Sequence, residues 1–147
     1  SIGDNCIIDG TKGDSSQHVC IGTLRPEAII YIGNNASLYS SRILAKFQVK
    51  IGDDVLMQEA GIMDTDFHSI DRSRSTPADE NNDKCQVKIG NNVCIGARSF
   101  ITKGVNIGDN VIIIPGSIVT MPIKAGGRVG GNPAKILNHV DLRHSLQ

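Results

Sequence analysis

A six-residue spacing of aliphatic residues runs through most of this 147-residue chain and limits the folds open to it. In the second half, an aliphatic residue opens each block of "IGNNVC IGARSF ITKGVN IGDNVI IIPGSI VTMPIK". This spacing matches neither the 3.6-residue period of a helix nor the alternation of a half-buried strand. It predicts short strands joined by sharp corners, with one large aliphatic side chain pointing inward per block. These inward positions are Ile89, Ile95, Ile101, Ile107, Ile113 and Val119.

The same frame extends toward the N-terminus, with one extra residue between Leu44 and Ile51. Residues 14–31 fit the frame poorly, and their placement stays open. The opening "SIGDNCIIDG" reads as a repeat entered midway, so we expect a further N-terminal segment. The predicted inward residues of this half are Ile32, Leu38, Leu44, Ile51, Met57 and Met63.

The corners carry residues that tolerate a positive φ, in "GNN", "GDD", "GNN" and "GDN" at 33–35, 52–54, 90–92 and 108–110. A longer repeat is also present, because "IGNNVCIGARSFI" recurs eighteen residues later as "IGDNVIIIPGSIV". Three blocks of six therefore form one coil of a triangular prism, and parallel coils stack on one another. The sequence predicts an all-β parallel β-helix.

Composition excludes several classes of function. Fifteen acidic and fifteen basic residues balance, so no net field attracts nucleic acid or an anionic membrane. No apolar run approaches the roughly 20 residues that span a bilayer. The four cysteines form no CxxC pair and no metal-like spacing, which favours free thiols in the cytoplasm.

The repeat stops at residue 63 and resumes at Val87. Residues 64–86 are polar and contain Pro77, so we expect a loop that protrudes from the prism, and long inserted loops are often functional. The β-helix domain is expected to span residues 1–135. Residues 136–147, "ILNHVDLRHSLQ", predict a short amphipathic C-terminal helix that caps the last coil.

Three motifs resemble the hexapeptide-repeat acyltransferases: "VKIGDDVL…DFHSID", "VKIGNNVCIGARSFITKGVNIGDNVIIIPGSIVT" and "VGGNPAKIL". The chain looks most similar to maltose and galactoside O-acetyltransferases and to acetyltransferases of capsular and exopolysaccharide synthesis. The resemblance implies a left-handed prism, although parallel crossovers are usually right-handed. It also implies acetyl-coenzyme A as co-substrate without a metal, a sugar or surface polysaccharide as acceptor, and a homotrimer whose active sites lie between subunits.

His68 matches the catalytic base of the resembling enzymes. An imidazole has an ordinary pKa of about 6.5, so it can remove the acceptor's hydroxyl proton at neutral pH, an effect worth about 10²–10⁴-fold. Asp66 is our choice for the acid that orients the ring, on proximity alone. Asp64, Asp71 and Glu59 remain possible partners and are the candidate acceptor-binding residues.

One position departs from the resembling sugar acetyltransferases. They carry an asparagine eight residues before the histidine, whereas this chain has Ala60 there, beside Glu59. We therefore expect acceptor recognition to differ from that of maltose or galactoside.

In the family, coenzyme A crosses successive coils in a groove between neighbouring prisms. Small residues let its pantetheine arm approach the backbone, although they also suit tight corners. Lys135 matches the partner of the 3′-phosphate, beside the turn of Pro133 and Ala134. The positions that match the pantetheine contacts are Ala97, Arg98, Gly116 and Ser117.

Other functions stay open. An N-acetyltransferase acting on an amino-sugar nucleotide could use the same base, and a non-catalytic β-helix scaffold needs none. A carbonic anhydrase relative requires three histidine ligands, but only His68 lies near the well-phased repeat. "HSIDRSRS" lacks the glycine-rich run of serine acetyltransferases, and no base lies beside Cys94 to make it a nucleophile.

Overall fold

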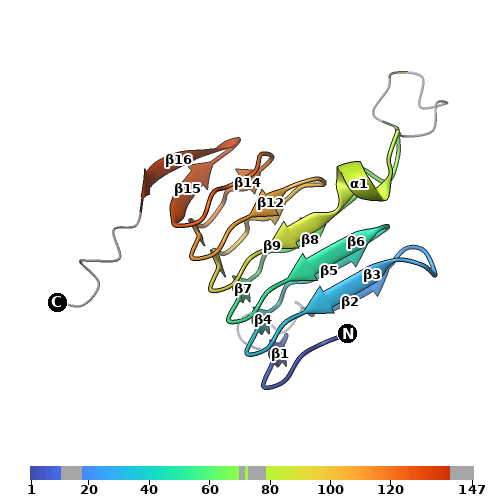
Figure 1. The fold of residues 1–147 in the computed structure, drawn as a ribbon, viewed down its shortest axis with the longest axis horizontal. Coiled ribbons are helices and arrows are strands. Elements are labelled where there is room, and N and C mark those ends of the chain that lie inside the picture. Colours follow the sequence, from blue (N-terminus) through green and yellow to red (C-terminus); the bar gives the residue numbers. More distant parts are fainter. Residues whose placement is uncertain (11–17, 70–71, 73–78, 140–147) are drawn as a thin grey trace.

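The computed structural model describes residues 1–10, 18–69, 72 and 79–139. Short strands stack along one axis from the N-terminal end (blue) to the C-terminal end (red), as Figure 1 shows. The described part of the chain has one helix, α1 (Asn82–Cys85), which stands outside the stack of strands (Figure 1). The all-β class predicted from the repeat is confirmed.

Three sheets form the sides of the prism. The seven-stranded sheet has the order β1 (Ile7–Asp9), β4 (Ser37–Tyr39), β7 (Leu56–Gln58), β10 (Cys94–Ile95), β13 (Ile112–Ile113), β15 (Gly127–Gly131) and β16 (Ala134–His139). The five-stranded sheet has the order β14 (Ile118–Val119), β11 (Phe100–Ile101), β8 (Gly61–Met63), β5 (Arg42–Ala45) and β2 (Cys20–Thr23). The four-stranded sheet has the order β12 (Asn106–Ile107), β9 (Val87–Ile89), β6 (Gln48–Ile51) and β3 (Ile29–Ile32).

The inward aliphatic residues form the core. All six positions predicted from the second half of the chain are buried, as are Ile32, Leu38, Ile51 and Met57. Parallel pairing places equivalent residues above one another, so Ile51 lies opposite Ile89, and Ile89 opposite Ile107. Each such side chain contributes roughly 1.5–3 kcal/mol when it is fully buried.

The predicted frame is wrong at two positions in the five-stranded sheet. Ile43 and Ile62 point inward and are buried, whereas Leu44 and Met63 are only half-buried. The register pairs Ile62 with both Ile43 and Ile101. The corners before β5 and before β8 are therefore each one residue shorter than the six-residue repeat requires.

Both ends of the chain differ from a plain repeat. Within residues 14–31, which the spacing could not place, the structure describes β2 and the first three residues of β3, with β2 paired to β5 and β3 to β6. The helix predicted for residues 136–147 is wrong for residues 136–139, which lie in β16, antiparallel to β15. An antiparallel partner covers the backbone edge of β15, as a capping element must. Residues 140–147 lie outside the described part.

One corner of the prism is held by a ladder of polar side chains. The Oδ1 atom of Asp53 accepts a hydrogen bond from the backbone N–H of Asn34 at 2.7 Å, and Asn91 does the same for Asp53 at 2.8 Å. A Cβ on Gly52 would lie 2.6 Å from the Gly90 carbonyl oxygen, so the coils approach too closely for a side chain there. The predicted positive φ angles are confirmed at Asn35 (56°), Asp54 (56°), Asn92 (53°) and Asn110 (57°).

The segment between β8 and β9 begins with Asp64, whose carboxylate is buried. Asp64 is fully buried, and its two oxygens accept hydrogen bonds from the backbone N–H groups of Lys46, Phe47 and Gln48 at 2.7, 2.8 and 2.7 Å. These donors form the wide corner between β5 and β6. Asp64 is therefore a structural residue of the prism, and the part that leaves the prism begins after it.

A second buried carboxylate holds the returning end of the same segment. The Glu80 side chain is 1% exposed and accepts hydrogen bonds from Lys46 Nζ at 2.7 Å and from the Asp66 N–H at 2.7 Å. Thr65 Oγ1 donates to it at 2.8 Å. Burial alone raises the pKa of Glu80, but the hydrogen bonds from Lys46, Asp66 and Thr65 outweigh it and lower the pKa to about 2.

The inward column makes a prediction for stability. Ile101→Ala removes a fully buried side chain and should lower the free energy of unfolding by about 2–5 kcal/mol. Ile112→Ala, at a position that is 38% exposed, should cost less than about 1.5 kcal/mol and is the matched control. Urea unfolding followed by circular dichroism measures both values. Equal losses would contradict the assigned inward register.

Glu80 makes a prediction for acid stability. Its pKa is depressed in the folded state, so its contribution is present above its ordinary pKa of 4.5 and is lost as the pH falls toward 2. The loss should approach about 3 kcal/mol over that window. Urea unfolding at pH 7, 4.5 and 2.5 should therefore show the gap between wild type and Glu80→Gln shrinking with acid. A gap that stays constant would show that Glu80 is not ionised in the native protein.

Candidate active site

His68 lies in the segment that follows β8 and is exposed. Its backbone N–H donates to the Asp66 carbonyl oxygen at 2.7 Å, and the preceding Phe67 has a φ of 64°. A positive φ is uncommon for a bulky residue and marks a sharp local turn. Among the described residues, the imidazole has no ion-pair or hydrogen-bond partner, so its ring is open to an approaching molecule.

Asp66, the predicted orienting acid, contacts a lysine instead of His68. Its carboxylate forms an ion pair with Lys103 Nζ at 2.5 Å. This hydrogen bond raises the pKa of Lys103, although partial burial acts in the opposite direction. Lys103 was not identified from the sequence, because it lies in an ordinary corner between β11 and β12.

The other acids predicted near His68 have different positions. Asp64 is fully buried and saturated by backbone donors, so the predicted contact with an acceptor does not fit its environment. Glu59 lies before β8, at the other end of that strand from His68. Asp71 lies outside the described residues. Glu80, which no motif indicated, is the acid that contacts the His68 segment.

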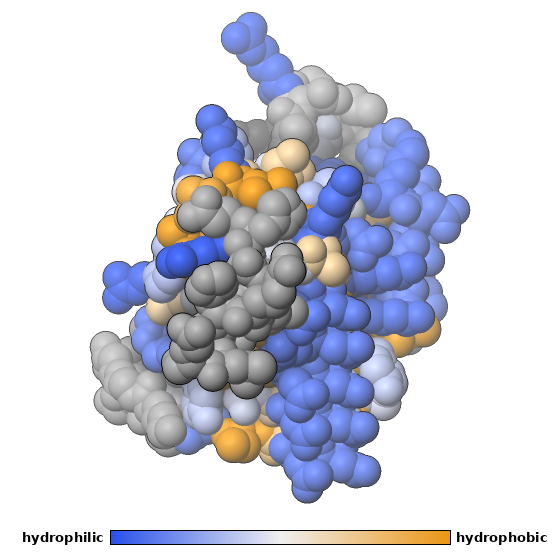
Figure 2. All heavy atoms as spheres, turned by 60° about the vertical axis from the view of Figure 1, so that its left-hand side comes forward, coloured by the Kyte–Doolittle hydropathy of each residue, from blue (hydrophilic) through white to orange (hydrophobic). Residues whose placement is uncertain are grey.

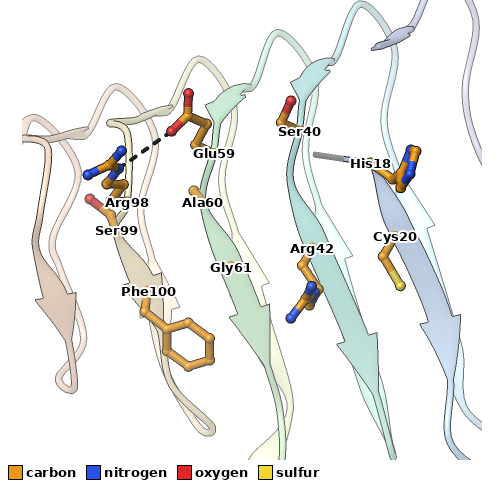
Figure 3. Close-up of a pocket in the computed structure, with 10 residues that line it drawn as sticks. All are labelled: His18, Cys20, Ser40, Arg42, Glu59, Ala60, Gly61, Arg98, Ser99 and Phe100. Carbon is orange, nitrogen blue, oxygen red and sulfur yellow. Dashed lines mark ion pairs between the residues drawn. The ribbon is translucent and has the colours of Figure 1, made fainter. Parts of the chain in front are cut away.

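The five-stranded sheet carries an open pocket of about 620 Å³ on its outer side (Figure 3). Arg42, Gly61 and Phe100 are neighbours in its row of paired residues. A Cβ on Gly61 would lie 2.7 Å from the Phe100 ring, so the absence of a side chain lets the ring cover the strand. The lining residues are His18, Cys20, Ser40, Arg42, Glu59, Ala60, Gly61, Arg98, Ser99 and Phe100.

Two predicted site residues meet at the upper edge of this pocket in Figure 3. Arg98 Nε lies 3.6 Å from a Glu59 carboxylate oxygen, and the two side chains are 82% and 25% exposed. An exposed pair at this distance contributes little to stability. Both residues have positive φ angles, 47° at Glu59 and 59° at Arg98, because they occupy equivalent corner positions on successive coils.

The predicted pantetheine positions also lie at this corner. The Gly116 N–H donates to the Ala97 carbonyl oxygen at 2.8 Å, which stacks the two coils. A Cβ on Gly116 would meet nothing within 4 Å, so the backbone faces open space. Ser117 is fully buried, and its hydroxyl donates to the Ile114 carbonyl oxygen at 2.6 Å. Its side chain is therefore part of the corner, and only the backbone nearby is accessible.

The "NPAK" residues form the hairpin turn between β15 and β16. Gly131 pairs with Ala134, and Pro133 is exposed between them. Ala134 is buried in the core, whereas Lys135 is exposed and has no ion-pair partner among the described residues. The turn predicted from the sequence is confirmed, and Lys135 is free to contact an anion.

The cysteines form no disulfide bond. All four are free thiols. Cys94 is half-buried on β10, between Leu56 and Ile112 in the neighbouring strands.

Within the described ranges, no group of three or more His, Cys, Asp or Glu side chains could hold a metal ion. The same ranges contain no helix long and apolar enough to cross a membrane. On the face drawn in Figure 2, apolar atoms (orange) form separate patches among hydrophilic ones (blue).

Known proteins share this architecture. Residues 86–121 match a family described as the hexapeptide repeat of succinyl-transferase. No curated protein sequence matches the chain. A galactoside acetyltransferase solved in complex with coenzyme A superposes with a TM-score of 0.75 and 27% identity, over 97% of this chain and 66% of that protein. The chain therefore spans slightly less than two thirds of that relative.

Two further structures agree with this match. A maltose O-acetyltransferase from Clostridium difficile 630 has a TM-score of 0.71 and 28% identity, over 96% of this chain and 70% of that one. A hexapeptide-repeat acetyltransferase from Vibrio cholerae shares the fold at a TM-score of 0.66 and 24% identity, over 94% of this chain and 72% of that one. Together with the parallel six-residue coils, these matches show that the chain has the left-handed parallel β-helix fold of hexapeptide-repeat acetyltransferases.

Proposed function

We propose that this protein transfers an acetyl group from acetyl-coenzyme A to a hydroxyl of a sugar, within a glycan of the bacterial cell surface. The observation that carries this proposal is the exposed imidazole of His68, just outside the prism. Over 97% of this chain, the structure matches a galactoside acetyltransferase solved with coenzyme A. Acetyl-coenzyme A is made in the cytoplasm, where we expect the reaction to take place.

The proposed reaction needs one general base and two aligned substrates. The His68 imidazole removes the acceptor's hydroxyl proton as the oxygen attacks the thioester carbonyl carbon. The tetrahedral intermediate then expels the coenzyme A sulfur, which takes the proton from the imidazolium. Products are the acetyl ester and the free thiol, and no acyl-enzyme forms. Most of the remaining rate enhancement comes from the alignment of the two substrates.

The donor is proposed to lie along the corner that stacks Ala97, Arg98 and Gly116. The open space above Gly116 supports this placement, because a pantetheine arm must come close to the backbone. Ser117 contributes backbone alone, since its side chain is buried. The exposed Lys135, next to Pro133 and Ala134, is the proposed partner of the 3′-phosphate. The residues need no metal for this chemistry.

The acceptor is proposed to enter the pocket that contains Glu59. Arg42, Arg98 and Glu59 supply charged hydrogen-bonding groups there, and the Phe100 ring offers an apolar wall. His68 does not line this pocket, because it follows the opposite end of β8. This separation supports a homotrimer in which His68 of one subunit faces the pocket of its neighbour.

Replacement of the base makes the first test. His68→Ala should lower the rate of acetyl transfer at least about a hundredfold and leave acetyl-coenzyme A binding intact. A free-thiol assay with methyl glycosides of glucose, galactose, N-acetylglucosamine and glucuronic acid measures the rate, and calorimetry measures binding. His144→Ala, in the tail, is the matched control and should retain full activity. Wild-type turnover in His68→Ala would remove this residue from the mechanism.

The phosphate contact makes a second test. Lys135→Ala should raise the KM for acetyl-coenzyme A about tenfold with little change in kcat, because only uniform binding energy is lost. The same variant should bind dephospho-coenzyme A, which lacks the 3′-phosphate, as well as wild type does. Lys50→Ala, an exposed lysine on β6, controls for loss of charge. An unchanged KM in Lys135→Ala would place the phosphate elsewhere.

A further inference from the structure

Four charged side chains meet where the chain leaves the prism after β8 and returns to it before α1. We call Lys46, Asp66, Glu80 and Lys103 the loop clamp. Lys46 Nζ lies 2.7 Å from Glu80, Lys103 Nζ lies 2.5 Å from Asp66, and Lys103 is 3.6 Å from Glu80. Two positive and two negative charges balance, and Lys46 compensates the buried Glu80, whose charge burial would otherwise penalise.

The clamp joins parts of the chain that are far apart in sequence. Lys46 follows β5 on the preceding coil, and Lys103 follows β11 on the next coil. Asp66 and Glu80 belong to the two ends of the protruding segment. The clamp therefore ties both ends of that segment to the coils on either side of it.

Short hydrogen bonds connect the clamp to His68. Glu80 accepts from the backbone N–H of Asp66 and from the hydroxyl of Thr65. Thr65 Oγ1 in turn accepts from the Phe67 N–H at 3.0 Å, and the His68 N–H donates to the Asp66 carbonyl oxygen. The backbone of residues 65–68 is thus fixed by a continuous set of bonds that starts at Glu80.

The other ion pairs in the described residues differ from the clamp. Lys84 and Asp79, on the same segment, lie 2.9 Å apart with side chains that are 59% and 89% exposed. Solvent screens such a pair, and its loss costs little. The Glu80 side chain is 1% exposed, so removal of its charge leaves Lys46 without its partner and takes from Lys103 its second acid at 3.6 Å, which changes the local geometry.

We propose that Glu80 and Lys103 are positioning residues for His68: they fix the backbone of residues 65–68 against the prism, so that the imidazole is presented in one place. This proposal rests on the role of His68 given under the proposed function. A base must lie within hydrogen-bonding reach of the acceptor's proton, and a displacement of about 1 Å can cost about 10²-fold in rate. The clamp acts on the rate through His68 and leaves donor binding untouched.

Kinetics of four variants test the proposal, with the best methyl glycoside of the panel as acceptor. Glu80→Gln and Lys103→Met should lower kcat at least about tenfold at a temperature well below their melting transitions, with the KM for acetyl-coenzyme A changed less than twofold. Lys103→Arg keeps the charge and should recover most of kcat. Lys84→Met removes the same charge from the exposed pair and should behave as wild type. A wild-type kcat in Glu80→Gln, with His68→Ala inactive, would overturn the clamp alone.

A double-mutant cycle separates positioning from a general loss of structure. If Glu80 acts through His68, Glu80→Gln should reduce the residual rate of His68→Ala by less than twofold. A further tenfold loss in that background would overturn the proposal. Amide hydrogen exchange supplies a readout that needs no turnover: the Phe67 and His68 amides should exchange at least about tenfold faster in Glu80→Gln than in Lys84→Met. Equal exchange rates would also overturn it, whatever the fate of the proposed reaction.

Discussion

Parallel pairing between coils is the interaction on which the rest of the structure depends. Except for β16, each strand forms its backbone hydrogen bonds with the equivalent strands of adjacent coils, so inward residues align in columns such as Ile32, Ile51, Ile89 and Ile107. The narrow interior admits aliphatic side chains and small residues only, which is why a chain with 3% aromatic residues can fill it. Because the sides of the prism are occupied by this packing, variation is confined to the corners.

The candidate base and the residues proposed to line the pantetheine groove accordingly lie at corners or beyond them, whereas Arg42 and Phe100 of the pocket lie on strands β5 and β11. Glu59, Arg98 and Gly116 repeat at one corner of successive coils, where positive φ angles turn the backbone outward. His68 leaves from another corner, the one at which Asp64 closes the backbone of the coil below. A regular scaffold thus carries the pocket and the exposed imidazole at opposite ends of β8, and no candidate catalytic residue lies in the core.

The protruding segment has a different source of order from the prism. It has no repeat and buries little apolar surface in its described part, so charged and hydrogen-bonded side chains must hold it. The clamp provides both signs of charge in equal number, which avoids the cost of an isolated buried ion. The electrostatic stabilisation of the segment is therefore separate from the hydrophobic stabilisation of the stack, which suits the proposed role of the segment in presenting a base.

The sequence by itself determined the coil, the corners and the start of the loop, because each depends on a local pattern of residue types. It misassigned Leu44 and Met63, since a corner shortened by one residue leaves the aliphatic pattern nearly unchanged and only pairing with Ile101 reveals the shift. It also predicted a helix where β16 pairs with β15, because an amphipathic segment adopts a strand when an open sheet edge is available. The contacts of Asp64, Glu80 and Lys103 were decided by the tertiary structure alone. Charges from three coils come together there through stacking, and no spacing along the chain records that contact.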